Sequence, residues 1–434
     1  MYLWQIEMVA LLLISILLFF LIGMPIAFAM GTGTLVALVF GSEIPLMIIP
    51  QRMFFGLNSW LLMAIPLFML AGQLMIHGGM SKRLVEFTSE LFGFIKGSLG
   101  YISVAASMIF AGVSGSSAAD TAAVGSIMLP IMKERGYNMN FATALQAAAG
   151  SIGPIIPPSL LMIIIGYVTD TSVSQLFLGG VIPGLLIGVG LMIVVYIHAS
   201  KGGKAYLQTR EDLNMKRLLS TGISALPSLG LPFIIIFGIV GGVFTITEAA
   251  VIAVVYGFIV GMFIYKEISI RDVPKILFES AELATIILFI QTTAFLFAWL
   301  ITVNEVPANL SNSLLSIISS KTGFYIMYII LLLLVGMVME SFSATIIFIP
   351  LIFPIAQSFG VDPVHFGVVT TVGWAIGYIT PPFGATLFVS CSLTNTSIRE
   401  VTPHILPIVI AMLVVLLIIT FFPDSVLWLP RLFT

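Results

Sequence analysis

The chain has 434 residues, of which 59% are hydrophobic and 8% are charged. Soluble domains carry about 25% charged residues, so this composition excludes a water-soluble protein and indicates one that lies in a lipid bilayer. The net charge of -2 excludes a nucleic-acid-binding protein, and the single cysteine, Cys391, excludes a disulfide framework or a thiolate metal cluster.

Apolar runs between polar residues predict where the chain crosses the membrane as a helix. The first five full crossings are expected near residues 4–22, 25–41, 60–78, 139–168 and 176–199. Five more are expected near residues 218–241, 246–265, 276–303, 365–393 and 402–423. The predicted fold class is an all-α polytopic membrane protein.

Two segments between these crossings, residues 80–97 and 308–320, have apolar residues on one helical face. An amphipathic helix of this kind lies in the plane of the membrane surface, and an ordinary loop helix is the alternative. Because the two segments occupy matching places in the two halves of the chain, we expect a pair of membrane-plane arms.

Two apolar stretches, about residues 99–134 and 323–360, are interrupted by polar tips, and their halves are too short to span a bilayer. The first tip reads VSGSSAADT and the second reads MVMESFSAT. Irregular backbone survives at membrane depth only where protein or water satisfies its polar groups, so each stretch predicts a re-entrant hairpin. Asp120 and Glu340 are candidates for binding there, with helix capping or hydration as the alternative.

The Lys and Arg residues orient this arrangement, because cytoplasmic loops hold an excess of them. If both hairpins return to the side they entered, every Lys and Arg except Arg52, Lys321 and Arg431 falls on one side. That side is predicted to be cytoplasmic, so both termini are expected on the outer side.

The sequence is also self-similar at an offset of 224 residues (336 minus 112). Matching positions include Gly112 and Gly336, Ser117 and Ser341, Thr121 and Thr345, Gly153 and Gly377, Pro157 and Pro381, and Pro158 and Pro382. The match predicts two halves, residues 1–217 and 218–434, each with five crossings and one hairpin. Because an odd number of crossings reverses orientation, the halves are expected to form an inverted repeat, which is a common transporter architecture.

The motifs GSIGPIIPPS (150–159) and GWAIGYITPPFG (373–384) each lie in the middle of a predicted crossing. Proline lacks a backbone donor and disfavours helix in the preceding residue, so both crossings, about 139–168 and 365–393, are predicted to be broken helices. Unwinding would free carbonyl oxygens for a sodium ion, and the half-helix N-terminus that follows would offer amide hydrogens to an anion.

We therefore predict two Na+ sites, each between a hairpin tip and the break of the same half, and no organic cofactor. The candidate Na+ ligands are Ser114, Ser117, Gly150, Ser151, Gly153 and Pro157 in the first half, and Gly336, Ser341, Gly373, Gly377 and Thr380 in the second. The candidate substrate-binding residues are Ser116, Asp120, Thr121, Ser159, Glu340, Ser343 and Thr386.

At these residues the chain resembles the large membrane subunit of tripartite ATP-independent periplasmic (TRAP) transporters, of the DctM/SiaM type. The motifs that carry the resemblance are IPLFMLAGQLM (65–75), FAGVSGSSAADTAAVGSIMLP (110–130), GPIIPPS (153–159), LFLGGVIPG (176–184), TITEAA (245–250) and GYITPPFG (377–384). The resemblance covers essentially the whole chain. The family usually has TPTEAA where this chain has Ile246, a departure that bears only on local helix geometry.

The resemblance implies sodium-driven secondary active uptake of a small organic acid that a periplasmic binding protein delivers. It also implies a small four-helix TRAP membrane subunit, expected here on a separate chain, and a place in the bacterial cytoplasmic (inner) membrane with both termini in the periplasm. An elevator motion is implied, in which both hairpins and both broken helices move past a scaffold of the crossings near 4–41 and 218–265.

Other functions are open at this point. One alternative is a stand-alone ion-coupled organic anion transporter of related inverted-repeat architecture, and less favoured ones are a channel or an intramembrane enzyme. An enzyme is not expected, because HExxH is absent and no histidine falls near the tip serines. The cargo is left open between a C4-dicarboxylate, sialic acid, a sugar acid and another small acid.

Overall fold

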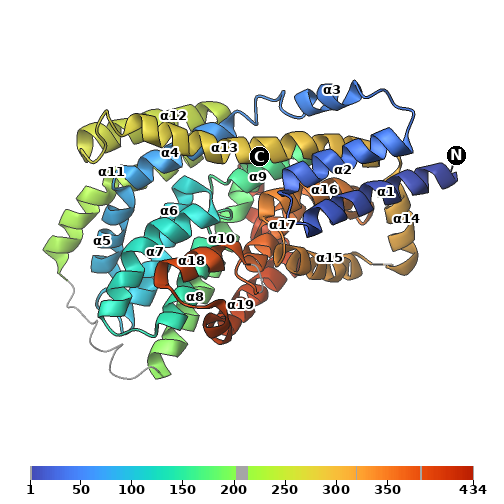
Figure 1. Cartoon of the computed structure of the whole chain (residues 1–434). Helices are drawn as coiled ribbons and strands as arrows, with labels where there is room; N and C mark the ends of the chain where they lie inside the picture. Colours follow the sequence, from blue (N-terminus) through green and yellow to red (C-terminus); the bar gives the residue numbers. More distant parts are fainter. Residues whose placement is uncertain (1, 202–213, 319, 382–383, 434) are drawn as a thin grey trace.

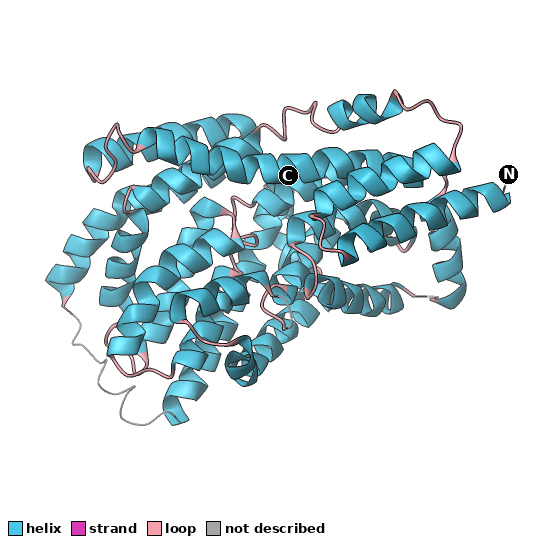
Figure 2. Cartoon of the chain, in the orientation of Figure 1, coloured by secondary structure: helices cyan, strands magenta, loops and turns pink. Residues whose placement is uncertain are grey.

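The computed structural model describes residues 2–201, 214–318, 320–381 and 384–433, and every regular element in these ranges is a helix (Figures 1 and 2). The helices up to residue 201 are α1 (Tyr2–Leu21), α2 (Ile26–Gly41), α3 (Ile48–Phe55), α4 (Ala64–His77), α5 (Met80–Phe92), α6 (Ser98–Ser114), α7 (Ser117–Glu134), α8 (Met139–Gly150), α9 (Leu160–Thr169) and α10 (Val173–Lys201). Those that follow are α11 (Met215–Val240), α12 (Ile246–Ile259) with the π-helix η2 (Val260–Ile264), α13 (Val273–Val303), α14 (Val306–Ile317), α15 (Lys321–Gly336), α16 (Ser341–Ser358), α17 (Pro363–Gly377), α18 (Ala385–Thr394), α19 (Ile398–Phe421) and α20 (Asp424–Leu432).

In the part of the chain that the structure describes, six helices are long and apolar enough to cross a membrane alone: α10, α11, α12 with η2, α13, α16 and α19. A seventh span results if α4 and α5, which meet at a bend of 63°, are taken together. The sequence predicts ten crossings; of the five predicted crossings outside this set, those at α8–α9 and α17–α18 are broken, and α2 and α4 are shorter than a full span. By contrast α16, expected to be half of a hairpin, has the length of a full span.

Prolines end the two helices that the sequence predicts to be broken. The chain leaves helical geometry at residues 151–159, which hold three prolines, and again at residues 378–381, the last of which is Pro381; Pro382 and Phe383 lie outside the described residues. Ser159 then starts α9, because its Oγ accepts the Met162 N–H at 3.1 Å.

The helices form an outer layer and an inner bundle (Figure 1). In the outer layer α11, α12, α4, α13, α2 and α1 follow one another, each packed against the next. In the inner bundle, α6–α10 and α15–α19, helices from the two parts of the chain pack together: α9 lies against α16, and α18 lies against α7 and α8. The predicted arms, α5 and α14, join the two bodies, because α5 contacts both α11 and α6, and α14 contacts both α13 and α16.

The two helices that lead into the breaks run through the centre of the bundle. All residues from Phe141 to Gly150 in α8 and from Val364 to Gly377 in α17 are buried. A helix that is apolar all round is stable only when protein or lipid covers every face, and here the bundle covers it. Both breaks are therefore placed in the interior of the molecule.

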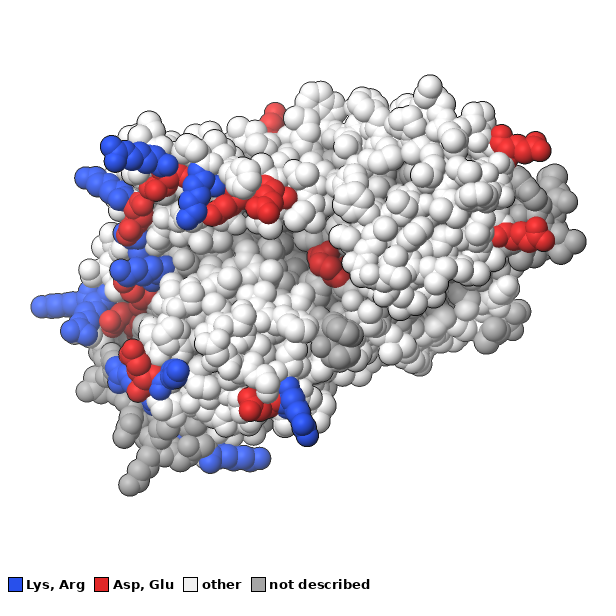
Figure 3. Space-filling view, in the orientation of Figure 1, with Lys and Arg blue, Asp and Glu red and all other residues white. Residues whose placement is uncertain are grey.

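Charged side chains are unevenly distributed over the surface. On the face drawn in Figure 3, Lys and Arg gather at the end of the molecule that α5, α11 and the turn between α12 and α13 form in Figure 1. The opposite end, near the N-terminus, shows only acidic side chains on that face.

The close contact between α15 and α17 leads to a prediction about stability. A Cβ placed at Gly377 would lie 2.6 Å from the Gly336 Cα, a backbone atom that cannot move away. We expect Gly377→Ala to lower the free energy of unfolding by about 1–3 kcal/mol, measured as thermal unfolding of the purified protein in detergent. The matched control is Gly190→Ala in α10, where a Cβ meets no atom nearer than 3.8 Å. Equal stability of the two variants would contradict the packing described here.

Candidate functional site

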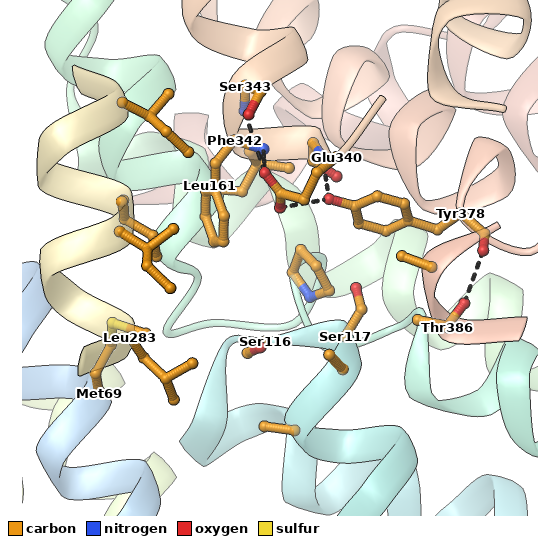
Figure 4. A pocket seen from close by; sticks show the side chains of 18 of the residues that line it. Met69, Ser116, Ser117, Leu161, Leu283, Glu340, Phe342, Ser343, Tyr378 and Thr386 are labelled. Carbon is orange, nitrogen blue, oxygen red and sulfur yellow. Dashed lines mark hydrogen bonds between the residues drawn. The ribbon is translucent and has the colours of Figure 1, made fainter. Parts of the chain in front are cut away.

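A cavity of about 950 Å³ lies between the outer layer and the inner bundle. From the outer layer, α2, α4 and α13 supply a mostly apolar wall with Phe28, Met69 and Leu283. From the bundle, the first turns of α7, α9, α16 and α18 reach the cavity (Figure 4). The polar residues of this second wall are Ser116, Ser117, Ser126, Glu340, Ser341, Ser343, Tyr378 and Thr386.

The first tip, between α6 and α7, packs directly onto the break between α8 and α9. Gly115 has a φ of +60°, and a Cβ there would lie 3.1 Å from Leu160 N and 3.3 Å from the Ser159 Cα. Only glycine combines that backbone geometry with so close an approach. Gly153 in the break is equally close, because its Cβ would lie 3.0 Å from the Ser116 carbonyl carbon. The first tip and its break thus form one packed unit.

Asp120 is fully buried in the first turn of α7. Its Oδ1 accepts a hydrogen bond from the Ser114 hydroxyl, whereas its Oδ2 has no partner among the described residues and lies against Gly153. The Thr121 hydroxyl is packed against Gly150 in the same way. A buried carboxylate oxygen without a donor or a cation is costly, so this region has the chemistry of a cation site.

The second tip, between α15 and α16, is tied to its break by Tyr378 (Figure 4). The Tyr378 hydroxyl donates to Glu340 Oε1 at 2.7 Å and accepts the Ser341 N–H. Glu340 Oε2 accepts the N–H groups of Phe342 and Ser343 at 2.9 and 3.2 Å, which caps α16. Glu340 itself stays exposed to the cavity.

Buried polar atoms without a partner gather at the two tips. Among the described residues, those at the first tip are Ser117 Oγ and Asp120 Oδ2, and those at the second are Ser341 Oγ and Thr345 Oγ1, while others, such as Gln291 Oε1, lie elsewhere. Ser117 and Ser341 both start a helix and line the cavity, although each is at most 5% exposed. Hydroxyl and carboxylate oxygens left open in this way are suitable ligands for a hard cation.

The structure divides the residues that the sequence predicts for binding. Those that line the cavity are Ser116, Ser117, Glu340, Ser341, Ser343 and Thr386. A second group is packed between the first tip and its break: Ser114, Asp120, Thr121, Gly150, Gly153, Pro157 and Ser159. At the second tip, Gly336 packs against Gly377 of the break. The hydroxyls of Ser151 and Thr380 donate to carbonyls of their own helices and Gly373 packs inside α17, so these three do not reach the cavity.

Two features of the site are missing from the sequence prediction. One is the apolar wall from α2, α4 and α13, and the other is Tyr378, which meets Glu340 although 38 residues separate them. A tyrosine beside a helix break in an apolar stretch needs a partner for its hydroxyl, which is the one signal that could have selected Tyr378. Nothing in a single sequence indicates which partner it meets.

The charges around the cavity are few. Among the described lining residues, Glu340 is the only acid and there is no Lys, Arg or His. Within the described part of the chain, no N-cap side chain accepts a hydrogen bond from the first turn of α7 or α18, so N–H groups and the positive dipole ends of these helices are open to an anion.

Comparison with known proteins places this geometry in context. The family described as "Tripartite ATP-independent periplasmic transporter, DctM component" matches residues 13–425. The chain is 37% identical over 406 residues to the isethionate TRAP transporter permease protein DctMQ of Oleidesulfovibrio alaskensis, covering 94% of this chain but only 64% of that protein. It is 35% identical to the C4-dicarboxylate TRAP transporter large permease protein DctM of Rhodobacter capsulatus, covering 95% of this chain and 96% of that one.

One further relative is named for a different cargo, and one solved structure shares the fold. The sialic acid TRAP transporter large permease protein SiaM of Vibrio cholerae is 33% identical, over 95% of this chain and 96% of its own length. The crystal structure of the YdaH transporter of Alcanivorax borkumensis superposes with a TM-score of 0.64 over 87% of each chain at 13% identity, a likeness of fold alone.

The unequal surroundings of two serines at the first tip generate a prediction. Ser114→Ala removes the hydroxyl that donates to buried Asp120, so we expect it to lower the free energy of unfolding by about 1–3 kcal/mol. Ser117→Ala removes a hydroxyl without a protein partner and is expected to be nearly neutral. Thermal unfolding of both variants in sodium-free buffer measures the difference, and equal losses would show that the Ser114–Asp120 bond contributes nothing.

Proposed function

The chain belongs to the DctM family of tripartite ATP-independent periplasmic transporters, and we propose on that premise that it is the large membrane subunit of a sodium-coupled importer of a small organic acid. As a member of this family the chain is a subunit of a membrane transporter and not an enzyme. The observation that carries the finer proposal is that both tips, both breaks and the apolar wall of the outer layer meet at one cavity.

Sodium is the coupling ion in this proposal, and the unpartnered atoms at the tips support it. The first site takes Ser117 Oγ and Asp120 Oδ2, beside the carbonyl groups of the first break. The second site takes Ser341 Oγ at the matching position of the second tip. Unwound carbonyls and hydroxyl oxygens are the ligands that sodium finds in other transporters with broken helices.

The acid group of the cargo binds at the uncapped first turns of α7 and α18. Both reach the cavity, through Ser117 and Thr386 among others. Free N–H groups and the helix dipole favour a carboxylate there, which removes the need for a basic side chain.

The two parts of the chain form an inverted repeat in this proposal, and helix positions support it. Helices α7 and α16 start at Ser117 and Ser341 and end at Glu134 and Ser358, so both ends keep the 224-residue offset of the sequence repeat. The other elements keep the same order in both parts of the chain: an arm (α5 or α14) precedes the tip, and a break (α8–α9 or α17–α18) follows it. The main departure is that α3 and α4 correspond to one continuous helix, α13.

The end of the molecule where Lys and Arg gather faces the cytoplasm of a bacterial cell, with the chain in the inner membrane. The cavity wall includes Ile76, which lies one residue from the end of α4 that leads into α5. The cavity thus opens toward the cytoplasm, which makes the structure an inward-facing state of the elevator cycle.

Transport requires two partners in this proposal: a periplasmic binding protein that delivers the acid, and a small membrane subunit. The relative named DctMQ extends well beyond its match to this chain, since the match covers 64% of it. We propose that the small subunit corresponds to that additional part.

The transport test uses liposomes that hold the chain with its small subunit, and its binding protein outside. Radiolabelled succinate, sialic acid and D-gluconate are offered separately, and uptake of a cargo acid is expected only with an inward sodium gradient. Ser117→Ala and Ser341→Ala should each raise the sodium concentration for half-maximal uptake about tenfold, the loss of about 1.4 kcal/mol of binding. The chain alone should take up little.

The control for these variants is Ser280→Ala, because Ser280 is buried in the outer layer and its hydroxyl donates within its own helix to Ile276 O. Sodium dependence that stays unchanged in both tip variants would refute the assignment of the tips. Strong uptake by the chain alone would favour a stand-alone transporter instead.

A disulfide tests the elevator motion on a Cys391→Ser background. A Cβ at Gly112 in α6 would lie 3.2 Å from the Pro232 Cβ in α11, so a cysteine pair there joins the bundle to the outer layer. We expect oxidation of this pair to stop uptake and reduction to restore it.

The matched control joins two helices of the outer layer, Gly257 of α12 and Leu74 of α4, whose Cβ atoms would also lie 3.2 Å apart. Oxidation of this second pair should leave uptake intact. Continued uptake with the first pair fully oxidised would rule out movement of the bundle past the layer.

A further inference from the structure

We infer that the cargo is an acid with a single carboxylate and a body rich in hydrogen-bond donors, and that Glu340, positioned by Tyr378, recognises those donors. This inference rests on the proposed function and narrows it, because it names the class of acid that the cavity accepts. It follows from where donors and acceptors lie around the cavity.

The start of α16 is closed to an acid group. Its first three N–H groups are all taken: that of Ser341 by the Tyr378 hydroxyl, and those of Phe342 and Ser343 by Glu340 Oε2. Helix starts that bind anions need free N–H groups, so this tip cannot take a carboxylate. The first turns of α7 and α18, which no side chain caps, are left for it.

Glu340 presents an acceptor to the cavity instead. A carboxylate has roughly four lone-pair positions, and three of those of Glu340 are filled by Tyr378, Phe342 and Ser343. The remaining one belongs to Oε1, the oxygen that the Tyr378 hydroxyl holds at 2.7 Å. Figure 4 shows Glu340 and Tyr378 turned toward each other at the cavity, so the tyrosine fixes the direction of this acceptor.

Capping of α16 alone does not account for this arrangement. A cap needs only the two bonds from Phe342 and Ser343 to Oε2, and a shorter, uncharged serine or asparagine would supply them. The Tyr378 bond engages the other oxygen, and it comes from the break that lines the same cavity. Glu340 also stays exposed there, so its carboxylate can contact a molecule in the cavity.

Around Glu340 the cavity is unfavourable to a second carboxylate on the cargo. No Lys, Arg or His lies among the described lining residues, and Glu340 would repel a carboxylate that offers it no hydrogen. Hydroxyl or amino groups do offer hydrogens. The outer wall, with Phe28, Met69 and Leu283, is mostly apolar. The polar groups that distinguish one acid from another therefore lie on the bundle side of the cavity.

Cysteine protection tests the inference on the purified chain with its small subunit, in sodium. Ala122 lines the cavity, and Ala122→Cys on the Cys391→Ser background reports occupancy through the rate of maleimide alkylation. Three six-carbon probes are compared: D-gluconate, hexanoate and adipate. We expect D-gluconate to slow alkylation at a concentration at least tenfold lower than hexanoate, which lacks hydroxyls, or adipate, which has a second carboxylate.

Variants then assign the effect to Glu340. Tyr378→Phe should weaken D-gluconate protection about tenfold and leave hexanoate unchanged. Glu340→Gln keeps an oxygen that can cap α16 but removes the negative charge. The difference between the concentrations of adipate and D-gluconate that slow alkylation should therefore become smaller. The matched control is Tyr325→Phe. Tyr325 is buried away from the cavity, with its hydroxyl 2.5 Å from His365 Nδ1, so this variant should leave protection by all three probes unchanged.

The possible failures are distinct. Equal protection by D-gluconate and adipate, or a preference that survives in both variants, overturns the inference while sodium-driven uptake can still stand. Absence of sodium-driven uptake of any acid, with the D-gluconate preference present, overturns the transport function and leaves the recognition in place.

Discussion

Backbone N–H and C=O groups in the middle of an apolar chain must find their hydrogen-bond partners within the protein. The rest of this structure depends on how those partners are supplied. The two breaks and the two tips expose N–H and C=O groups that lipid cannot pair. Each tip therefore packs onto a break at a distance that only glycine allows: Gly115 against Ser159 at the first, and Gly336 against Gly377 at the second. The small residues of these motifs are required by this contact.

That requirement also explains why the two parts of the chain interpenetrate. The half-helices that follow the breaks are short, and each finds cover on the other part of the chain, α9 against α16 and α18 against α7 and α8. Helices α8 and α17 are enclosed on every side. The result is a bundle that contains both tips and is joined to the outer layer through the arms α5 and α14.

The two tips satisfy their polar groups differently, although the sequence repeat makes them equivalent. At the first, the acid is buried one turn into the helix and pairs with Ser114 while its second oxygen stays open. At the second, the acid caps the helix, faces the cavity and is held by Tyr378. The 224-residue offset places Pro154 opposite Tyr378, so the first break has no hydroxyl at that position. The two tips, which match in sequence, thus differ in their chemistry.

The sequence by itself determined the class of protein, most helix positions and the places of the breaks, because composition, apolar length and proline act locally. Six of the predicted binding residues line the cavity for the same reason: hydroxyl and acidic residues in apolar surroundings stand out. It predicted no helix at α3 or α20, whose short segments carry no such signal.

Only the tertiary structure decided which of these residues meet. Ser151 and Thr380 have the expected chemistry, but their hydroxyls are used within their own helices. The pairing of Tyr378 with Glu340 and the apolar wall of α2, α4 and α13 depend on contacts between segments far apart in the chain. Local sequence sets the chemistry available at each position, whereas packing of the bundle against the outer layer sets which groups face the cavity, since that depends on all the helices at once.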